Sequence, residues 1–373
     1  MVDITDRNGA DDAAGGPEPE QSKLDARVQL QQLAADLRST VLRVVWRQWR
    51  ELGAGAAGGS ESGGHQLRAL IDPEALVLIS LMLIRDERRL SDVLYDWAVQ
   101  NSDLLSVQRL KNLETDYPAP VQGPLTHRLS WFAMVALDEG KDSRWKSLAQ
   151  ARSERAAIAP HAHGQQDESL TVIEPAAHAR AAYPSGDVFA KLRGVRVRLT
   201  PDAALLLRLR LGFGVGLKAD VVGFLLTRVD DWATVRDITD ALGYTVAAVR
   251  RVAEDMAAAR LIESRDGQPA SYRTAVDAWK SLLRFTDRPP RWASWQERFV
   301  FATSFLHWAE EIGDRPLSAY AFGAQGRHML EKHRSAFEHD GIAVWSAHAP
   351  VNDWGAFAAA SVRSLAAWIE ENG

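Results

Sequence analysis

Residues 220–274 read DVVGFLLTRVDDWATVRDITDALGYTVAAVRRVAEDMAAARLIESRDGQPASYRT, and this stretch decides the predicted fold. Its pattern predicts an apolar helix that ends near Val229, a helix over 235–242, a tight turn, and a longer helix over 246–260. A two-stranded hairpin follows, with Asp266-Gly267 at its tip, because this dipeptide favours a turn between strands. The segment is therefore predicted to form a helix, a helix-turn-helix and a hairpin, in that order.

The residues at the turn support this prediction. Gly243 directly follows Leu242, the last apolar residue of the 235–242 helix, and glycine is the residue that best tolerates the positive φ of a helix C-terminal cap. The hydroxyl of Thr245 can then cap the next helix. Leu261 and Ile262, after that helix, are predicted to start the first strand of the hairpin.

Both helices carry apolar residues at intervals of three and four, as expected when one face of a helix is buried. On the 235–242 helix the apolar stripe is formed by Val235, Ile238 and Leu242. On the longer helix it is formed by Val246, Val249, Val252, Ala253 and Met256. The two stripes predict that the helices pack against each other.

The stretch VRDITDALGYTVAAVRRVAEDMAAARLIESRDG, residues 235–267, resembles the winged helix-turn-helix domain of MarR- and ArsR-type bacterial transcriptional regulators. The resemblance rests on this stretch and covers about 55 residues, 220–274. It implies that Val246–Arg260 is a DNA recognition helix. It also implies a set of DNA-binding residues on this helix and on the wing, where arginine can bond base edges or phosphates. This set is Thr245, Ala247, Ala248, Arg250, Arg251, Arg265 and Arg273.

The charge of residues 220–274 leaves a second interpretation open. This stretch has seven arginines, no lysine and nine acidic residues, which is a net charge of minus two. DNA-binding surfaces are usually basic, because neutralising phosphates provides much of their affinity. The acidic pair Glu254 and Asp255 even follows the arginine pair on the predicted recognition helix. The alternative is a non-enzymatic interaction or scaffold protein whose winged helix docks a protein partner.

The composition of the whole chain is that of an ordinary globular protein, with 46% apolar and 25% charged residues among 373. Cysteine is absent, which excludes disulfides and thiolate chemistry and fits a cytoplasmic location. The longest apolar run, residues 75–84, is about half the length of a membrane span, so we expect a buried helix and no membrane association.

The predicted fold class is mainly α, and the elements outside the central unit divide the chain further. We expect an acidic disordered tail over 1–22 and a helical N-terminal domain over 23–150. A long helix over 24–52 and a Gly/Ser linker over 53–64 belong to that domain. Shorter helices are predicted in it at 73–86, 89–100, 103–115 and 124–137.

The rest of the chain continues the helical pattern. Residues 151–187 are predicted to be a linker or loop, 188–274 a helix followed by the winged unit, and 275–373 a helical domain rich in tryptophan. The 24–52 helix has a broad apolar face, which can pair with a second copy or pack onto its own chain. The tryptophans are expected to fill a core, with ligand stacking as the alternative.

The sequence contains no catalytic motif of a familiar type. The glycines at 212, 214 and 216 match neither dinucleotide nor P-loop spacing, and no GxSxG elbow or HExxH pair is present. We therefore expect no enzyme activity, no catalytic residue, no metal site and no cofactor. The sequence predicts a DNA-binding transcriptional regulator that acts as a homodimer, in which the helical domains dimerise or sense a ligand.

Overall fold

The computed structural model describes residues 20–54, 67–150, 196–229, 231–284, 289–313, 319–338, 342 and 354–373. The described chain is mainly helical and has one small antiparallel sheet, which confirms the predicted mainly-α class. The predicted linker over 151–187, residues 55–64 of the predicted linker over 53–64, and the first 19 residues of the acidic tail lie outside the described residues. The last three residues of the predicted tail belong instead to helix α1, which begins at Glu20.

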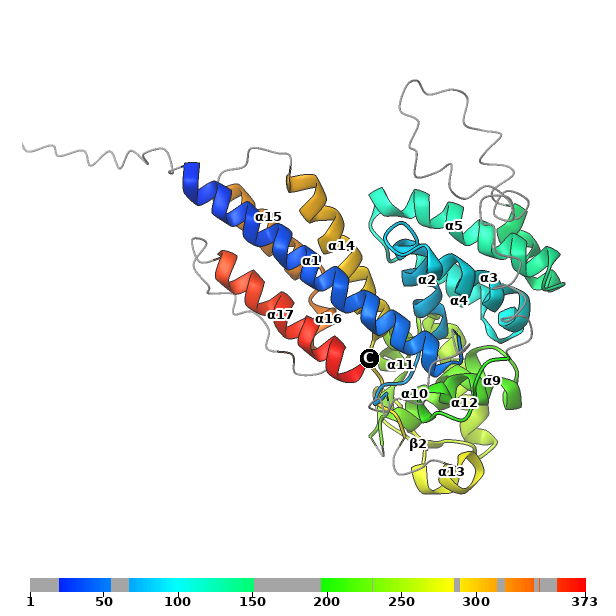
Figure 1. The fold of residues 1–373 in the computed structure, drawn as a ribbon. Coiled ribbons are helices and arrows are strands. Elements are labelled where there is room, and N and C mark those ends of the chain that lie inside the picture. Colours follow the sequence, from blue (N-terminus) through cyan, green and yellow to red (C-terminus); the bar gives the residue numbers. More distant parts are fainter. Residues whose placement is uncertain are drawn as a thin grey trace, which may run out of the picture.

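The long N-terminal helix α1 (Glu20–Glu51) packs against two helices from the other end of the chain. They are α14 (Trp295–Gly313) and α17 (Trp354–Asn372), and Figure 1 shows α17 running alongside α1. The apolar face of α1 is buried by these helices and by α2 (Pro73–Leu83) and α3 (Arg89–Asn101), since Trp49 donates to the hydroxyl of Ser80 and packs on the ring of Trp97. Packing of α1 onto its own chain is therefore the alternative that the structure shows.

A second group of helices surrounds α2, whose side chains are almost all buried. Helices α3, α4 (Val107–Glu114) and α5 (Ala119–Asp138) pack around it, and α14 also contacts it. Asp72 caps α2 by accepting a hydrogen bond from the amide of Ala75 at 3.1 Å.

Two of the helix starts predicted here were wrong. Helix α4 begins at Val107 and not at residue 103, because Ser102–Leu104 form a 3₁₀ turn and the Ser106 side chain caps α4. Helix α5 begins at Ala119 and not at residue 124. A proline near its start suits the first helical turn, and Pro124 lies inside the helix without ending it.

The helices from the predicted N-terminal and C-terminal helical regions contribute to one hydrophobic core. Trp295 of α14 stacks on Phe299 with ring centroids 5.4 Å apart, and its indole nitrogen donates to the carbonyl of Leu70 at 2.8 Å. Trp145, which follows α5, is also fully buried and packs on Phe132. These described tryptophans fill the core.

Residues 205–283 form a second cluster of elements with a core of their own. Helix α9 (Leu205–Phe213) is followed by α10 (Leu217–Thr227), and Gly214 and Gly216, both with positive φ, separate the two helices. Helix α10 begins before Asp220 and ends before Val229, where the backbone φ is positive. The apolar helix is therefore displaced by about two to three residues from its predicted bounds.

The remaining elements of this cluster are β1 (Ala233–Thr234), α11 (Val235–Leu242), α12 (Val246–Ala258), β2 (Glu263–Arg265), β3 (Ser271–Arg273) and α13 (Val276–Leu283). The sheet is antiparallel with the order β1-β3-β2, and Ser264 pairs with Tyr272 across the hairpin. Leu261 and Ile262 precede β2, because the chain leaves α12 through Arg260 at positive φ and Ile262 turns into the core. Asp266-Gly267 lies in the hairpin loop as predicted.

Local capping explains where α11 and α12 begin. Thr234 and Asp237 form a reciprocal capping box at the start of α11, which satisfies two backbone amides. Gly243 ends α11 in the left-handed conformation, with φ 69° and ψ 27°, and its amide donates to Thr239. The Thr245 hydroxyl accepts from the amide of Ala248 at 3.4 Å, as predicted for the cap of α12.

Replacing Gly243 with alanine is expected to lower the free energy of unfolding by about 1–3 kcal/mol. The left-handed backbone strains any residue with a Cβ, and a Cβ at this position would lie 2.8 Å from Cδ2 of Leu113 on α4. Urea unfolding followed by tryptophan fluorescence measures the change. The matched control is Gly123→Ala inside α5, where a Cβ meets nothing within 4 Å. This control should be neutral or stabilising, and equal losses in both variants would contradict the expectation.

Candidate nucleic-acid interface

Helix α12 has one buried face and one face open to solvent. Val249, Val252 and Met256 point into the local core as predicted, whereas Val246 is 46% exposed and does not belong to the buried stripe. Of the predicted DNA-binding residues on and next to this helix, Ala248 is half-buried and four are exposed. The exposed ones are Thr245, Ala247, Arg250 and Arg251.

An open groove of about 790 Å³ lies beside this exposed face. It is bounded by the start of α11, by the outer face of α12 and by the hairpin loop from Gly267 to Ala270. Arg250 and Arg236 line it, whereas Arg251 does not. The groove therefore brings an arginine from each helix of the helix-turn-helix next to the tip of the hairpin.

Arg236 was not among the predicted site residues. Its side chain is 88% exposed, and its nearest acidic partner is Asp240, one turn further along α11, at 3.8 Å. The first helix of a DNA-bound helix-turn-helix commonly crosses the phosphate backbone. An exposed arginine in the first turn of α11 was the signal that could have identified this residue.

The two arginines of the hairpin, Arg265 on β2 and Arg273 on β3, lie against Trp232, which immediately precedes β1. The guanidinium carbons of Arg265 and Arg273 each lie 4.7 Å from the centroid of the Trp232 ring. Arg273 also donates through Nε to Oε2 of Glu263 on the paired strand, at 2.6 Å. Arg265 is exposed, whereas Arg273 is half-buried and its charge is locally compensated. The aromatic ring orders both side chains by cation–π contact, a role for Trp232 that the sequence prediction missed.

Acidic residues share the same surface. Glu254 lines the groove together with Arg250, one turn away on α12, and Asp255 is exposed beside it. Each carboxylate lowers the positive potential that the neighbouring arginines create. The exposed face of α12 therefore carries both acidic and basic side chains.

A buried cluster of charged residues joins α2, α4, α9 and α10 beside the turn between α11 and α12. Its two guanidinium groups, from Arg109 on α4 and Arg210 on α9, face three carboxylates, and all five side chains are at most 4% exposed. The carboxylates belong to Asp72, Glu74 and Asp220. Glu74 bridges both arginines, since its Oε2 accepts from Arg109 Nη1 at 2.7 Å and its Oε1 from Arg210 Nη1 at 2.6 Å.

Side chains of α4 bond directly to the turn between α11 and α12. Arg109 Nε donates to the carbonyl of Leu242 at 2.8 Å, and Asn112 Nδ2 donates to the carbonyl of Gly243 at 2.9 Å. The Tyr244 hydroxyl donates to Oδ2 of Asp220 at 2.8 Å. The last carbonyls of α11 are thereby satisfied by a helix more than a hundred residues earlier in the chain. The position of α12 is therefore tied to the helical body.

Ionisation of the cluster follows from its pairing. Burial by itself would raise the pKa of Glu74, but the positive charges of Arg210 and Arg109 and the hydrogen bonds to its carboxylate outweigh burial and lower that pKa to about 2. Burial and the nearby Asp220 charge raise the pKa of Tyr244, so its hydroxyl stays protonated and acts as a donor. Glu74 is therefore ionised over the whole physiological pH range.

The sequence contained an unused signal for this cluster. Arg210 lies within LLLRLRL, an apolar run that predicts a buried helix, and a buried arginine requires an acidic partner. Asp72 caps α2 and also pairs with Arg109.

Comparisons with known proteins returned no match: no protein-family model matches the chain, nor does any curated protein or solved structure. Within the described residues, no helix is both long and apolar enough to cross a membrane. The described part of the chain also contains no group of three or more His, Cys, Asp or Glu residues placed to hold a metal ion.

Proposed function

We propose that residues 217–274 form a winged helix-turn-helix that binds duplex DNA and that the protein regulates transcription in the cytoplasm. The observation that carries the proposal is the exposed face of α12, which bears Arg250 and Arg251. Arg250 lines the groove beside the loop of the hairpin whose strands carry Arg265 and Arg273. The tight turn at Gly243 and the sheet order β1-β3-β2 agree with this type of domain. In the proposed complex α12 enters the major groove and the hairpin lies along the adjacent backbone.

The helical body has a positioning role in this proposal. Because Arg109 and Asn112 bond the turn before α12, the recognition helix is presented at a fixed angle to the rest of the molecule. A rigid reading helix loses little conformational entropy when it binds. A change in the packing of α4 would then be transmitted directly to α12.

We also propose a homodimer, since two reading helices one helical turn apart are needed for paired half-sites. The apolar face of α1 is buried within its own chain by α14 and α17, so the dimer interface must use another surface. Light scattering at the concentrations used for DNA binding measures the mass of the particle.

The test of DNA binding is a mobility-shift titration with fragments of the source genome. At low salt a subset of fragments should shift, and for about four neutralised phosphates a fourfold rise in salt should weaken binding about a hundredfold. The four exposed arginines of the interface are the source of this salt dependence, since Arg273 is paired with Glu263; they are Arg236, Arg250, Arg251 and Arg265. If no fragment shifts at either salt concentration, DNA binding is excluded.

A second candidate function is favoured by the acidic residues of this surface. Glu254 shares the groove with Arg250, and the apolar side chain of Val246 also opens into it. Such a mixed surface suits a protein partner better than a phosphate backbone. A pull-down from cell extract with and without nuclease separates the two candidates, because a protein partner survives nuclease and a DNA-bridged one does not.

A further inference from the structure

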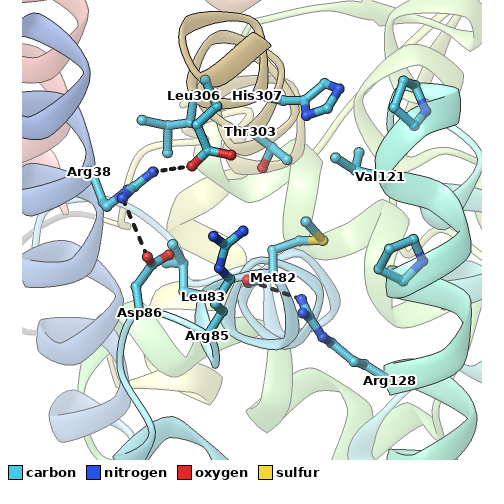
Figure 2. A pocket seen from close by; sticks show the side chains of 13 residues that line it. Arg38, Met82, Leu83, Arg85, Asp86, Val121, Arg128, Thr303, Leu306 and His307 are labelled. Carbon is cyan, nitrogen blue, oxygen red and sulfur yellow. Dashed lines mark hydrogen bonds and ion pairs between the residues drawn. The ribbon is translucent and has the colours of Figure 1, made fainter. Parts of the chain in front are cut away.

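A separate pocket lies where four helices of the body meet, and none of its lining residues belongs to the segment 217–274. Its volume is about 480 Å³, within the range of small-molecule sites. Figure 2 shows the side chains that surround it, from α1, the end of α2, α5 and α14. Arg38 of α1 lines the pocket and forms an ion pair with Asp86 at 3.4 Å.

The apolar part of the pocket lining is aliphatic. The rest of the lining is polar or charged and consists of Arg38, Arg85, Asp86, Arg128, Thr303, His307 and Glu310. Val121 and Leu306 are buried beside it, Met82 and Leu83 close one end, and the lining contains no Phe, Tyr or Trp. Two prolines of α5 complete the apolar surface; these are Pro120 and Pro124. An alkyl chain fits these aliphatic side chains better than an aromatic ring does, because an aromatic ring gains most from packing on other aromatic rings.

Two of the three arginines that line the pocket are already occupied. Arg38 donates through Nη2 to Oε1 of Glu310 at 2.7 Å, and it also pairs with Asp86. Arg128 is buried and donates through Nη1 to the carbonyls of Leu81 and Met82 at 3.1 and 3.2 Å, which fastens the end of α2 to α5. Both arginines build the pocket and keep its shape.

Arg85 is different. It follows the end of α2, and Figure 2 shows its guanidinium group rising into the space between Asp86 and Met82. Within the described ranges Arg85 forms no salt bridge, so its charge is available to a ligand. A cation beside the aliphatic part of a pocket suits an amphipathic anion, because the alkyl chain can pack on the apolar side chains while the acid group meets the cation.

We propose that this pocket binds an aliphatic carboxylate, with the alkyl chain between α5 and α14 and the carboxylate on the guanidinium of Arg85. The guanidinium group donates two parallel hydrogen bonds to the carboxylate, and burial of the apolar alkyl chain contributes the rest of the affinity. Binding at this site does not depend on the proposed DNA binding.

The test is isothermal titration calorimetry on the full chain with octanoate as the probe. We expect saturable binding of octanoate, and at least a tenfold rise of its Kd in Arg85→Gln. The matched control is Arg88→Gln, which removes the same charge from an exposed position outside the pocket lining and should change the Kd less than twofold.

Two further probes test the contributions of the alkyl chain and of the carboxylate separately. Inorganic phosphate, which has no alkyl chain, should not compete with octanoate, and 1-octanol should bind equally to the parent protein and to Arg85→Gln. Circular dichroism establishes that both variants keep the parent fold. The proposal is overturned if octanoate does not saturate the protein, if Arg85→Gln binds octanoate as the parent does, or if phosphate alone displaces it.

Discussion

Replacing Arg210 with methionine is expected to lower the free energy of unfolding by about 3–5 kcal/mol, the usual loss when one partner of a buried ion pair is removed. Methionine matches the size and helix propensity of arginine but leaves the carboxylates of Glu74 and Asp220 without their shared partner. Both carboxylates are fully buried, so water cannot replace the lost hydrogen bonds. Urea unfolding followed by tryptophan fluorescence measures the change.

The control for this prediction is an arginine of the same segment at the surface. Arg236→Met on α11 removes a guanidinium whose ion pair with Asp240 is long and exposed, and such pairs contribute only about 0.3–0.5 kcal/mol. A loss below about 1 kcal/mol for Arg210→Met would show that the cluster does not stabilise the junction between α2, α9 and α10.

The second large effect is expected for DNA binding. Replacing Arg250 and Arg251 together with alanine should weaken binding to a specific fragment by about 2–6 kcal/mol, with about 1–3 kcal/mol for each lost base contact. Stability should hardly change, because both side chains are exposed and alanine is the best helix former. Fluorescence anisotropy of a labelled duplex taken from a shifted fragment measures the affinity.

A matched double variant separates specific contacts from total charge. Arg88 and Arg89 are an exposed arginine pair at the start of α3, and their replacement by alanine removes the same two charges from another surface. This control should leave the affinity nearly unchanged. If the Arg250 and Arg251 variant behaves like the control, α12 does not read DNA, and the protein-partner candidate becomes the better explanation of this surface.

The local structure around the turn could be predicted because each step depends on neighbouring residues. Helix α11 has the predicted bounds, Gly243 has the left-handed backbone that its place after Leu242 required, and Thr245 caps α12. These features follow from hydrogen bonds within four residues and from the φ preference of glycine. The errors were also local, since Val246 has the spacing of a buried residue but lies at the first position of α12, beyond the reach of the core.

The candidate site was only partly predictable for a different reason. Arg250 and Arg251 were found by their place on a helix, and helical spacing correctly put them on the exposed face. Trp232 was missed because its contact with the two hairpin arginines depends on the path of the chain before β1. Arg236 was missed because its place in the groove depends on the position of the hairpin loop. A partner across the sheet, such as Tyr272 for Ala233, is chosen by the tertiary fold.

By itself the sequence determined the mainly helical class, the helices α11 and α12 with the glycine turn between them, and the exposed arginines of α12. All of these follow from periodicity, capping and backbone preference over short distances. Only the tertiary structure decided that α1 packs on α17, that Glu74 joins Arg109 to Arg210, and that Arg85 lines a pocket between α1, α2, α5 and α14. The physical reason is that a buried charge or apolar face must find a partner, and which partner it meets depends on how distant segments pack.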